Sequence, residues 1–500
     1  MSFLPKRSKT NKLLVTNSAD CAILSPVGPA SVRERNMDMN NQHSADVSRQ
    51  LAAAPVGKLL LKLAAPTVVA QLVNLLYNIV DRIYIGHMPD VGRVALTGIG
   101  LCFPVLCLTG AFTMLIAQGG APRAAIAMGE GDDARAERIM GSCFTCLIIA
   151  SLALTGVFWA FGEPLLWIFG CSQETILYAL PYMRIYSSGS VFVMMALGMN
   201  LFVTTQGFTT VSMRTVLIGA VSNIILDPIF IYGLHMGVQG AALATVLSQA
   251  ISGIWVVRFL MGEKSTLRLR RECLRPSWRI MAPVLALGVS PFIMQSTEAL
   301  LNISFNASLQ RYGGDVAVGA MTIASTVLQM VWIPSQGLGQ GAQPIISYNY
   351  GARNAKRVKE AFFALLKASC TLMMTFWLLV ELFPQAFIRI FNSDPALMDT
   401  AVWTLRVYVA SLGLFGIQLT VQQTFMSIGK AKASLFIACL RKIILLIPLI
   451  FLLPRFFENK VLAVFLAEPV SDLISIAASA VTFFFVFRSA MAELEQDPQQ

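Results

Sequence analysis

Two aspartates within long apolar stretches are the residues of this chain best suited to do chemistry. Asp81 lies in LLYNIVDRIYIG and Asp227 lies in VSNIILDPIFIYG, and both stretches are otherwise nearly free of charge. An isolated acid in a membrane-spanning helix costs about 2.5–3.5 kcal/mol on insertion, so such residues usually have a function. In the simpler alternative, Asp227 only hydrogen-bonds Asn223 or accompanies a distortion at Pro228. The pattern favours a functional role.

Asn223 and Thr245 are predicted to complete one site with the two aspartates. Asn223 precedes Asp227 by four residues, which places both side chains on one helix face. The short connection YGLHMG makes the next helix, with Thr245, a neighbour, and Asp81 lies at a similar depth. Two carboxylates in a poorly solvated pocket repel each other, so the pair would hold a proton, or Na⁺ with help from amide and hydroxyl oxygens. Loading that cation on one side and losing it on the other would couple its gradient to transport.

The composition places these residues in a membrane protein. Of 500 residues, 56% are hydrophobic and 13% charged, whereas soluble proteins carry about 25% charged residues. The mean hydropathy is +0.66. We predict an all-α integral membrane protein, since helices fit the apolar runs better than barrel strands. Twelve transmembrane spans are expected, at 59–84, 94–118, 139–161, 178–204, 215–233, 238–261, 281–309, 316–340, 361–383, 400–426, 434–453 and 461–487.

Basic residues predict the orientation in the membrane. Lys and Arg are concentrated in the loops 119–138, 205–214, 258–280, 341–360 and 427–433 and in the tail. The protein is therefore expected in the plasma (inner) membrane, with these loops and both termini on the cytoplasmic side. Much of the net charge of +11 follows from this bias. We expect no nucleic-acid partner, because the richest cluster lies in a short loop between helices.

The chain contains an internal repeat. A shift of 222 residues places Val94-Ala95 on Val316-Ala317, Gly129 on Gly351, and Gly207 on Gly429. Each half would form a six-helix lobe, and the two pseudo-symmetric lobes would face each other across a cleft. The expected domains are an extension (1–55), a first lobe (56–262), a linker (263–280), a second lobe (281–488) and a tail (489–500). This plan is typical of a carrier that alternates its access and functions as a monomer.

The aspartates break the repeat. Asp81 corresponds to Asn306 when Pro66 is placed on Pro291, and Asp227 corresponds to an apolar residue. Neither acid is therefore needed to build a lobe. Features that occur in one half only are candidates for the chemistry.

Two basic residues of the second half need partners. Arg441 and Lys442 lie at about the depth of Asp472, which follows Glu468 by one helical turn. A buried cation is rarely left unpaired. We predict a structural ion pair between this basic pair and Asp472.

Catalytic and redox functions find little support. Most of the nine cysteines lie within spans, and Cys143 and Cys146 are interpreted as small core residues rather than a redox or metal pair. The sequence has no metalloprotease motif and no nucleophile–histidine constellation. We predict no enzyme and no cofactor besides the coupling ion. The polar segment 1–55 is expected to be a disordered cytoplasmic extension, with Met37 or Met39 as the hypothetical natural start.

Four segments together resemble the multidrug and toxic compound extrusion (MATE) transporters, over residues 50 to 488. They are LLYNIVDRIYIGH, NIILDPIFIYGLHMGVQGAALATVLSQ, GVSPFIMQSTEALLN and QGLGQGAQPIISYNYGARNAKRV. The resemblance implies two six-helix lobes and the export of organic, often aromatic, cations in exchange for H⁺ or Na⁺. In the branch with coupling carboxylates in the N-terminal lobe, the motif positions match Asp81, Asn223, Asp227 and Thr245 here.

Another branch of this family couples through a glutamate of the seventh helix and an aspartate of the tenth. Glu298 matches the first, with Gln295 and Asn302 on its helix face, but the tenth helix here contains no acid. These three residues are expected either to line a substrate cleft or to serve a structural role. The same holds for Gln329, Gln336, Gln340 and Gln343. The alternative function is a flippase of lipid-linked precursors, because related flippases share the doubled plan.

Overall fold

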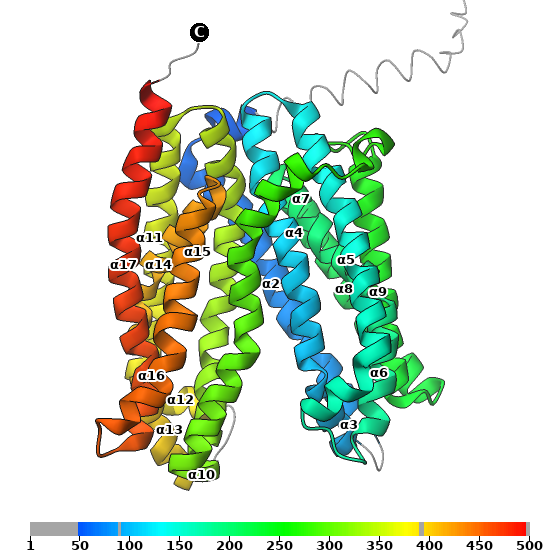
Figure 1. The fold of residues 1–500 in the computed structure, drawn as a ribbon, viewed down its shortest axis with the longest axis vertical. Helices are drawn as coiled ribbons and strands as arrows, with labels where there is room; N and C mark the ends of the chain where they lie inside the picture. Colours follow the sequence, from blue (N-terminus) through cyan, green and yellow to red (C-terminus); the bar gives the residue numbers. More distant parts are fainter. Residues whose placement is uncertain (1–48, 89–91, 390–394, 497–500) are drawn as a thin grey trace, which may run out of the picture.

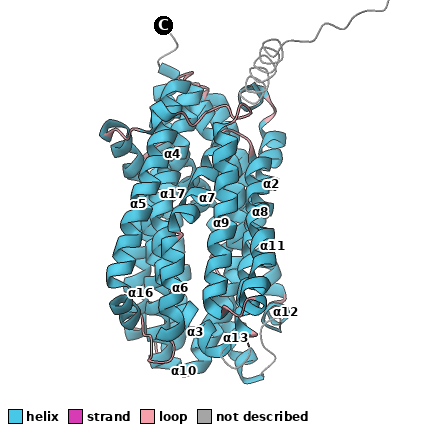
Figure 2. Cartoon of the chain, turned by 90° about the vertical axis from the view of Figure 1, so that its right-hand side faces the viewer, coloured by secondary structure: helices cyan, strands magenta, loops and turns pink. Residues whose placement is uncertain are grey.

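The computed structural model describes residues 49–88, 92–389 and 395–496, which form helices joined by loops, with no strand among them (Figure 2). The first lobe consists of α2 (Val56–Gly86), α3 (Gly92–Leu101), α4 (Phe103–Gly129), α5 (Asp133–Ile168), α6 (Ile176–Ser188), α7 (Ser190–Thr205), α8 (Thr209–Pro228), the π-helical turn η1 (Ile229–Gly233) and α9 (Gly237–Met261). A 3₁₀ turn, η2 (Arg271–Leu274), follows. The second lobe consists of α10 (Trp278–Gly351), α11 (Ala355–Leu382), α12 (Pro384–Arg389), α13 (Pro395–Tyr408), α14 (Leu412–Ser427), α15 (Ala431–Cys439), the π-helical turn η3 (Leu440–Leu446), α16 (Ile447–Leu452), η4 (Leu453–Arg455) and α17 (Lys460–Gln496).

Three breaks explain how these helices make twelve spans. The 74 residues of α10 are interrupted at Gly314, whose φ of 62° and ψ of −158° are not helical, so α10 contains two spans. The pairs α6–α7 and α13–α14 bend by 54° and 44° and each count as one span. With these pairs and the other long apolar helices, the described residues form twelve membrane-spanning segments, as predicted.

The internal repeat has counterparts in the backbone. Asp132 caps α5 by accepting a hydrogen bond from Arg135 N at 2.9 Å, and Asn354 caps α11 by accepting one from Arg357 N at 3.1 Å. These caps lie at equivalent positions of the two halves. Gly207 and Gly429 are also equivalent, and both take a positive φ where one helix turns into the next. The halves therefore share their turn and cap chemistry, not only their apolar pattern.

The two lobes contact each other near the end at which α2 begins and α17 ends, here called the terminal end, and diverge toward the opposite end (Figure 1). The Thr67 hydroxyl donates a 2.6 Å hydrogen bond to the carbonyl oxygen of Gly337 in the second lobe. A Cβ atom added to Gly351 would overlap the backbone of Ile126, so the α4 and α10 backbones touch there. Close packing thus joins the lobes on one side of the membrane.

The expectation of disorder through residue 55 is wrong for the part of the extension that the structure describes. Residues 49–53 are helical, and Leu51 is 1% exposed. The Arg357 side chain donates to the carbonyl oxygens of Leu51 at 3.0 Å and Ala54 at 2.8 Å. These bonds tie the start of the first lobe to α11 of the second. Residues 1–48, which include the hypothetical start sites, lie outside the described residues.

The predicted linker between the lobes and the predicted tail both have defined structure. Gln206 of the first lobe accepts hydrogen bonds from Leu267 N at 2.8 Å and from the Ser265 hydroxyl at 2.9 Å. Glu137 forms an ion pair with Arg270 at 3.1 Å. The predicted linker is therefore fastened to the first lobe. Helix α17 continues to Gln496, so most of the predicted tail is helical.

Candidate functional site

Asp81 and Asp227 meet inside the first lobe. Asp81 lies on α2 and Asp227 at the end of α8, and their carboxyl groups are close enough for each to act on the charge of the other. Asp227 is fully buried and Asp81 half-buried. One oxygen of each, Asp81 Oδ1 and Asp227 Oδ2, is buried without a hydrogen-bond partner. No Lys or Arg among the described residues forms an ion pair with either acid.

Asn223 belongs to this pair, and Thr245 lies beside it without a bond to it. The Asn223 amide nitrogen donates to Asp227 Oδ1 at 3.2 Å, and its carbonyl oxygen is buried and unpartnered. The half-buried Thr245 is on α9, which packs against α8. No hydrogen bond joins its hydroxyl to either acid in the described part of the chain. Of the four predicted residues, Asp81, Asp227 and Asn223 therefore form one connected group, and Thr245 lies beside this group.

Local sequence explains why Asp227 can sit here. Pro228 follows it, and a proline has no amide hydrogen to donate to the preceding turn. The helix continues as the π turn η1 (Ile229–Gly233), a wider geometry that often marks functional sites. The Tyr232 hydroxyl fixes this turn to α2 by donating a 2.6 Å hydrogen bond to the carbonyl oxygen of Tyr84. The chain thus positions the end of α8 against the C-terminal part of α2.

Aromatic and amide side chains that were not predicted from the sequence lie near this pair. Tyr77 is near both acids, and its hydroxyl interacts with Gln249 of α9. Tyr182, on α6, is buried close to Asp81, and its ring stacks on Tyr186 with centroids 6.3 Å apart. Helical spacing could have found two of them, because Tyr77 precedes Asp81 by four residues and Gln249 follows Thr245 by four. Nothing in the sequence connects α6 to the site.

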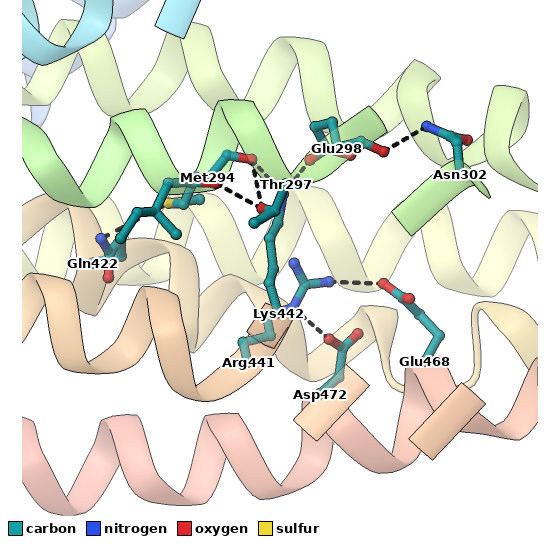
Figure 3. Close-up of polar contacts among 10 residues, drawn as sticks. Met294, Thr297, Glu298, Asn302, Gln422, Arg441, Lys442, Glu468 and Asp472 are labelled. Atoms are coloured by element: carbon teal, nitrogen blue, oxygen red, sulfur yellow. Dashed lines mark hydrogen bonds and ion pairs between the residues drawn. The ribbon is translucent and has the colours of Figure 1, made fainter. Parts of the chain in front are cut away.

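The second lobe holds a different charged cluster, and Arg441 lies at its centre (Figure 3). Arg441, in the π turn η3, contacts Asp472 at 2.7 Å and Glu468 at 2.8 Å, both on α17. Its guanidinium also lies over the Phe415 ring, 4.5 Å from the centroid. The prediction of a structural ion pair with Asp472 is confirmed for Arg441. Glu468, one turn from Asp472, is a second partner.

The same prediction is wrong for Lys442. Its ammonium group forms an ion pair with Glu298 on α10 and donates a 2.8 Å hydrogen bond to the carbonyl oxygen of Met294 (Figure 3). Successive side chains of a helical turn point in different directions, so the neighbours Arg441 and Lys442 face different helices. Lys442 therefore connects α10 to η3, while Arg441 connects η3 to α17.

A cavity lies between the two lobes. Of the three residues predicted to line a substrate cleft, Gln295 is in the cavity wall, and Glu298 and Asn302 are not. Glu298 is paired with Lys442, although 45% of its side chain is exposed. The Asn302 amide donates to the backbone oxygen of Glu298 at 2.9 Å and is exposed. Both follow Gln295 along α10, and neither is in the cavity wall. A role for Glu298 in attracting solute is compatible with its exposure.

The cavity itself lies between the lobes and has a volume of about 290 Å³. Most of its wall comes from α10, α14, α15 and η3, with α2 and α4 contributing from the first lobe. Eight glutamines line it: Gln71, Gln118, Gln295, Gln336, Gln340, Gln418, Gln422 and Gln423. Gln336 and Gln340 were among the glutamines suggested from the sequence, whereas Gln329 and Gln343 are not in the wall. Trp332, Phe415, Arg441 and Lys442 are also in it.

The first-lobe arrangement suits a small hard cation. Two carboxylates side by side repel each other, and a shared proton or an added cation removes that repulsion. The unpartnered oxygens of Asp81, Asp227 and Asn223 are the oxygen donors that hard cations prefer. The donor set therefore fits H⁺ and Na⁺ equally. The described residues hold no cluster of three His, Cys, Asp or Glu that would indicate a transition-metal site.

Twelve spans in two repeated lobes, a cavity between the lobes and a carboxylate pair in one lobe define a transporter-like membrane protein. The sequence profile of the MatE family matches residues 66–229 in the first half and residues 291–452 in the second. Because these matches cover more than half of the chain, it belongs to the MatE family. The resemblance seen in the sequence motifs is thereby confirmed.

Individual relatives and solved structures agree with this assignment. The chain is 24% identical over 400 residues to the multidrug export protein MepA of Staphylococcus haemolyticus, covering 80% of this chain and 87% of the relative. An outward-facing multidrug resistance MATE transporter has a similar fold, with a TM-score of 0.81, 21% identity and coverage of 89% and 98%. A MOP superfamily transporter from Pyrococcus furiosus gives the same values.

Proposed function

We propose that this protein is a secondary active exporter that exchanges H⁺ or Na⁺ for small organic compounds, with Asp81 and Asp227 as the coupling site. The observation that carries the proposal is the proximity of these two acids, which have unpartnered buried oxygens and form no ion pair with a Lys or Arg among the described residues. The electrostatic repulsion within such a pair changes greatly when a cation binds or leaves. The MepA relatives, which are named multidrug export proteins, support the export of organic compounds.

Organic cations, often aromatic, are the proposed substrates. The cluster in the second lobe supports this class, because Glu298, Glu468 and Asp472 outnumber Arg441 and Lys442 by one. Glu298, the half-exposed member, would attract a cation from the space between the lobes. The protein would act without catalysis and as a monomer, since one chain supplies both lobes and the cavity.

Alternating access is the proposed mechanism. Close contacts at the terminal end, such as Thr67 with Gly337, support an arrangement closed on that side, with the lobes diverging on the other (Figure 1). Loss of the coupling cation would favour rearrangement of α2 against α8, and α2 also contacts the second lobe. In a plasma membrane with both termini in the cytoplasm, the closed side would be the cytoplasmic one.

One observation favours the alternative function of a lipid-linked precursor flippase. Arg441 and Lys442 line the cavity, and a pyrophosphate group would need cationic residues there. Each of them, however, is already paired with a carboxylate, so the cavity has no surplus positive charge. An exporter would lower dye accumulation in a host that lacks its own pumps, whereas a flippase would leave the dye unchanged.

Purified protein in proteoliposomes provides the test of coupling. A H⁺ gradient and a Na⁺ gradient are imposed separately, and the uptake of a fluorescent organic cation is followed. We expect one gradient to drive uptake, and Asp81→Asn and Asp227→Asn each to abolish it. The matched control is Asp399→Asn, an exposed acid of α13, which should transport normally. Normal coupled transport by both aspartate variants would contradict the proposal.

A further inference from the structure

A strongly basic segment joins the two lobes. From Glu263 to Arg279 the chain has six Lys or Arg residues and two acids, which leaves a clear excess of positive charge. This segment is the predicted linker, and it lies at the terminal end of the first lobe (Figure 1). Hydrogen bonds to Gln206 and an ion pair with Glu137 hold it there. Its charged side chains are therefore presented from a fixed backbone.

The turn η2 of this segment lies beside the membrane-spanning part of α5. A Cβ atom added to Gly141 would overlap the carbonyl oxygen of Cys273. The Thr145 hydroxyl donates a 2.6 Å hydrogen bond to the carbonyl oxygen of Leu274. Gly141 and Thr145 lie in the third and fourth turns of α5, about 12 and 18 Å from its start. The span predicted for this helix is 139–161, so η2 lies where the headgroup layer meets the hydrocarbon.

Four arginines that lie in or near this turn have no acidic partner. Arg271 and Arg275 lie at the start of η2 and directly after it, and Arg279 lies in the first turn of α10. Arg138 lies on α5, near the Cys273 thiol. All four side chains are exposed, and none forms an ion pair with another described residue. A free guanidinium can bind two oxygens of one phosphate group.

An exposed tryptophan lies beside these arginines. Trp278, the first residue of α10, is 75% exposed. The span predicted for this part of α10 is 281–309, so Trp278 lies just outside the hydrocarbon, where tryptophan is enriched in membrane proteins. The four arginines and Trp278 are here called the linker patch. Cationic groups beside an aromatic ring at this depth match a lipid, which has a phosphate above an apolar chain.

We propose that the linker patch binds the headgroups of anionic phospholipids in the leaflet at the terminal end. The guanidinium groups would bind the lipid phosphate, and Trp278 would pack on the glycerol and the upper part of an acyl chain. Basic segments next to membrane-spanning helices gain affinity for an anionic leaflet from each Lys or Arg near the surface. The inference goes beyond the proposed function, because it concerns neither the coupling ion nor the substrate.

Lipid binding to the delipidated full-length protein tests the patch. Native mass spectrometry in a non-ionic detergent counts the bound molecules and gives their affinities. The probes are phosphatidylglycerol, phosphatidylcholine with the same acyl chains, and glycerol 3-phosphate, which has the phosphate without the chains. We expect phosphatidylglycerol to bind at least about tenfold more tightly than either. Equal binding of phosphatidylcholine would overturn the role of charge, and equal binding of glycerol 3-phosphate would overturn the assignment to a lipid.

Two triple variants, each lacking three exposed positive charges at the terminal end, separate the patch from net charge. The patch variant is Arg271→Gln, Arg275→Gln and Arg279→Gln. The matched control is Lys58→Gln, Lys356→Gln and Lys432→Gln. We expect the patch variant to bind phosphatidylglycerol about a hundredfold more weakly, about fivefold for each arginine, and the control to bind it nearly as the unmodified protein does. Equal losses in the two variants would overturn the proposal.

Fluorescence quenching locates the bound lipid with a single conservative change. Phosphatidylglycerol with brominated acyl chains quenches a tryptophan that it contacts. We expect it to quench the unmodified protein more than brominated phosphatidylcholine does, and Trp278→Phe to remove this excess. Unfolding temperatures in the same detergent show whether each variant is folded. An excess that persists in folded Trp278→Phe would place the lipid at another tryptophan and overturn the patch as its site. Both measurements need neither an ion gradient nor a substrate, so their results are independent of the exchange assay in proteoliposomes.

Discussion

The acids inside the two lobes have different electrostatic surroundings. In the first lobe, Asp81 and Asp227 lie near each other, and Asn223 donates a hydrogen bond to Asp227. In the second lobe, Glu468 and Asp472 both contact Arg441. The helices that hold these groups contain matching irregularities, since Asp227 precedes the π turn η1 and Arg441 lies in the π turn η3.

This difference is the one expected if, as proposed, the first lobe binds a mobile ion and the charged cluster of the second lobe is structural. A carboxylate held by a guanidinium in the protein has its charge compensated in every state, and bringing in another cation gains little. Two carboxylates that form no ion pair with the protein are compensated better when H⁺ or Na⁺ is bound. We therefore expect removal of a charge to damage stability in the second lobe and transport in the first.

The largest effect on stability should follow from loss of Arg441. Arg441→Met leaves Glu468 and Asp472 buried without a cation, which should lower the free energy of unfolding by about 3–5 kcal/mol. Adding Glu468→Gln and Asp472→Asn to that variant removes the unpaired charges and should recover most of the loss. Thermal unfolding in detergent measures both. A triple variant as unstable as the single one would show that packing, not charge, dominates here.

Asp472→Asn should have the next largest effect and allows a direct comparison with the first lobe. Arg441 keeps Glu468 as a partner, so we expect a loss of about 1–3 kcal/mol. The same change at Asp227 relieves repulsion with Asp81 and should not lower stability. Both variants are compared by their unfolding temperatures in one detergent. A larger loss for Asp227→Asn would reverse the assignment of roles to the lobes.

The pair between Lys442 and Glu298 should contribute less, because Glu298 is half-exposed to solvent. Either Lys442→Gln or Glu298→Gln alone should lower stability by about 1–2 kcal/mol. Exchanging the two residues, as Lys442→Glu with Glu298→Lys, should restore part of the lost stability. The exchange of Lys442 with Asp472 should not, because the structure pairs Asp472 with Arg441. Rescue by the second exchange and not the first would contradict the observed pairing.

Most of the fold follows from the sequence, because burial in a membrane requires long apolar helices. The spans and the repeat could be predicted from apolar runs and from equivalent residues such as Gly129 and Gly351. The local bond between Asn223 and Asp227 follows from helical spacing. The break at Gly314 lies between the two spans predicted at 281–309 and 316–340, and divides α10 there.

Contacts between distant helices were harder to predict. Depth along the membrane suggested Asp472 for both basic residues, but depth contains no information on which way a side chain points around its helix. Lys442 consequently pairs with Glu298 on α10. Tyr182 was missed for a similar reason, since its approach to Asp81 depends on the packing of α6. The π turns also shift the facing of residues that follow them, and the sequence does not reveal them.

The smallest predicted effects concern features that both halves share, and they complete the comparison. Asp132 and Asn354 cap α5 and α11 at equivalent positions. Asp132→Ala and Asn354→Ala should each lower stability by about 1 kcal/mol, since each exposes one backbone amide at a helix start. Neither should change the ion dependence of transport. Equal losses, measured by chemical unfolding in detergent, would mean that the halves are symmetric in their folding and differ only in their buried charges. A transport defect in Asp132→Ala alone would instead extend the asymmetry to the terminal end of the first lobe, where Asp132 and the segment bound to Glu137 and Gln206 lie on the same side.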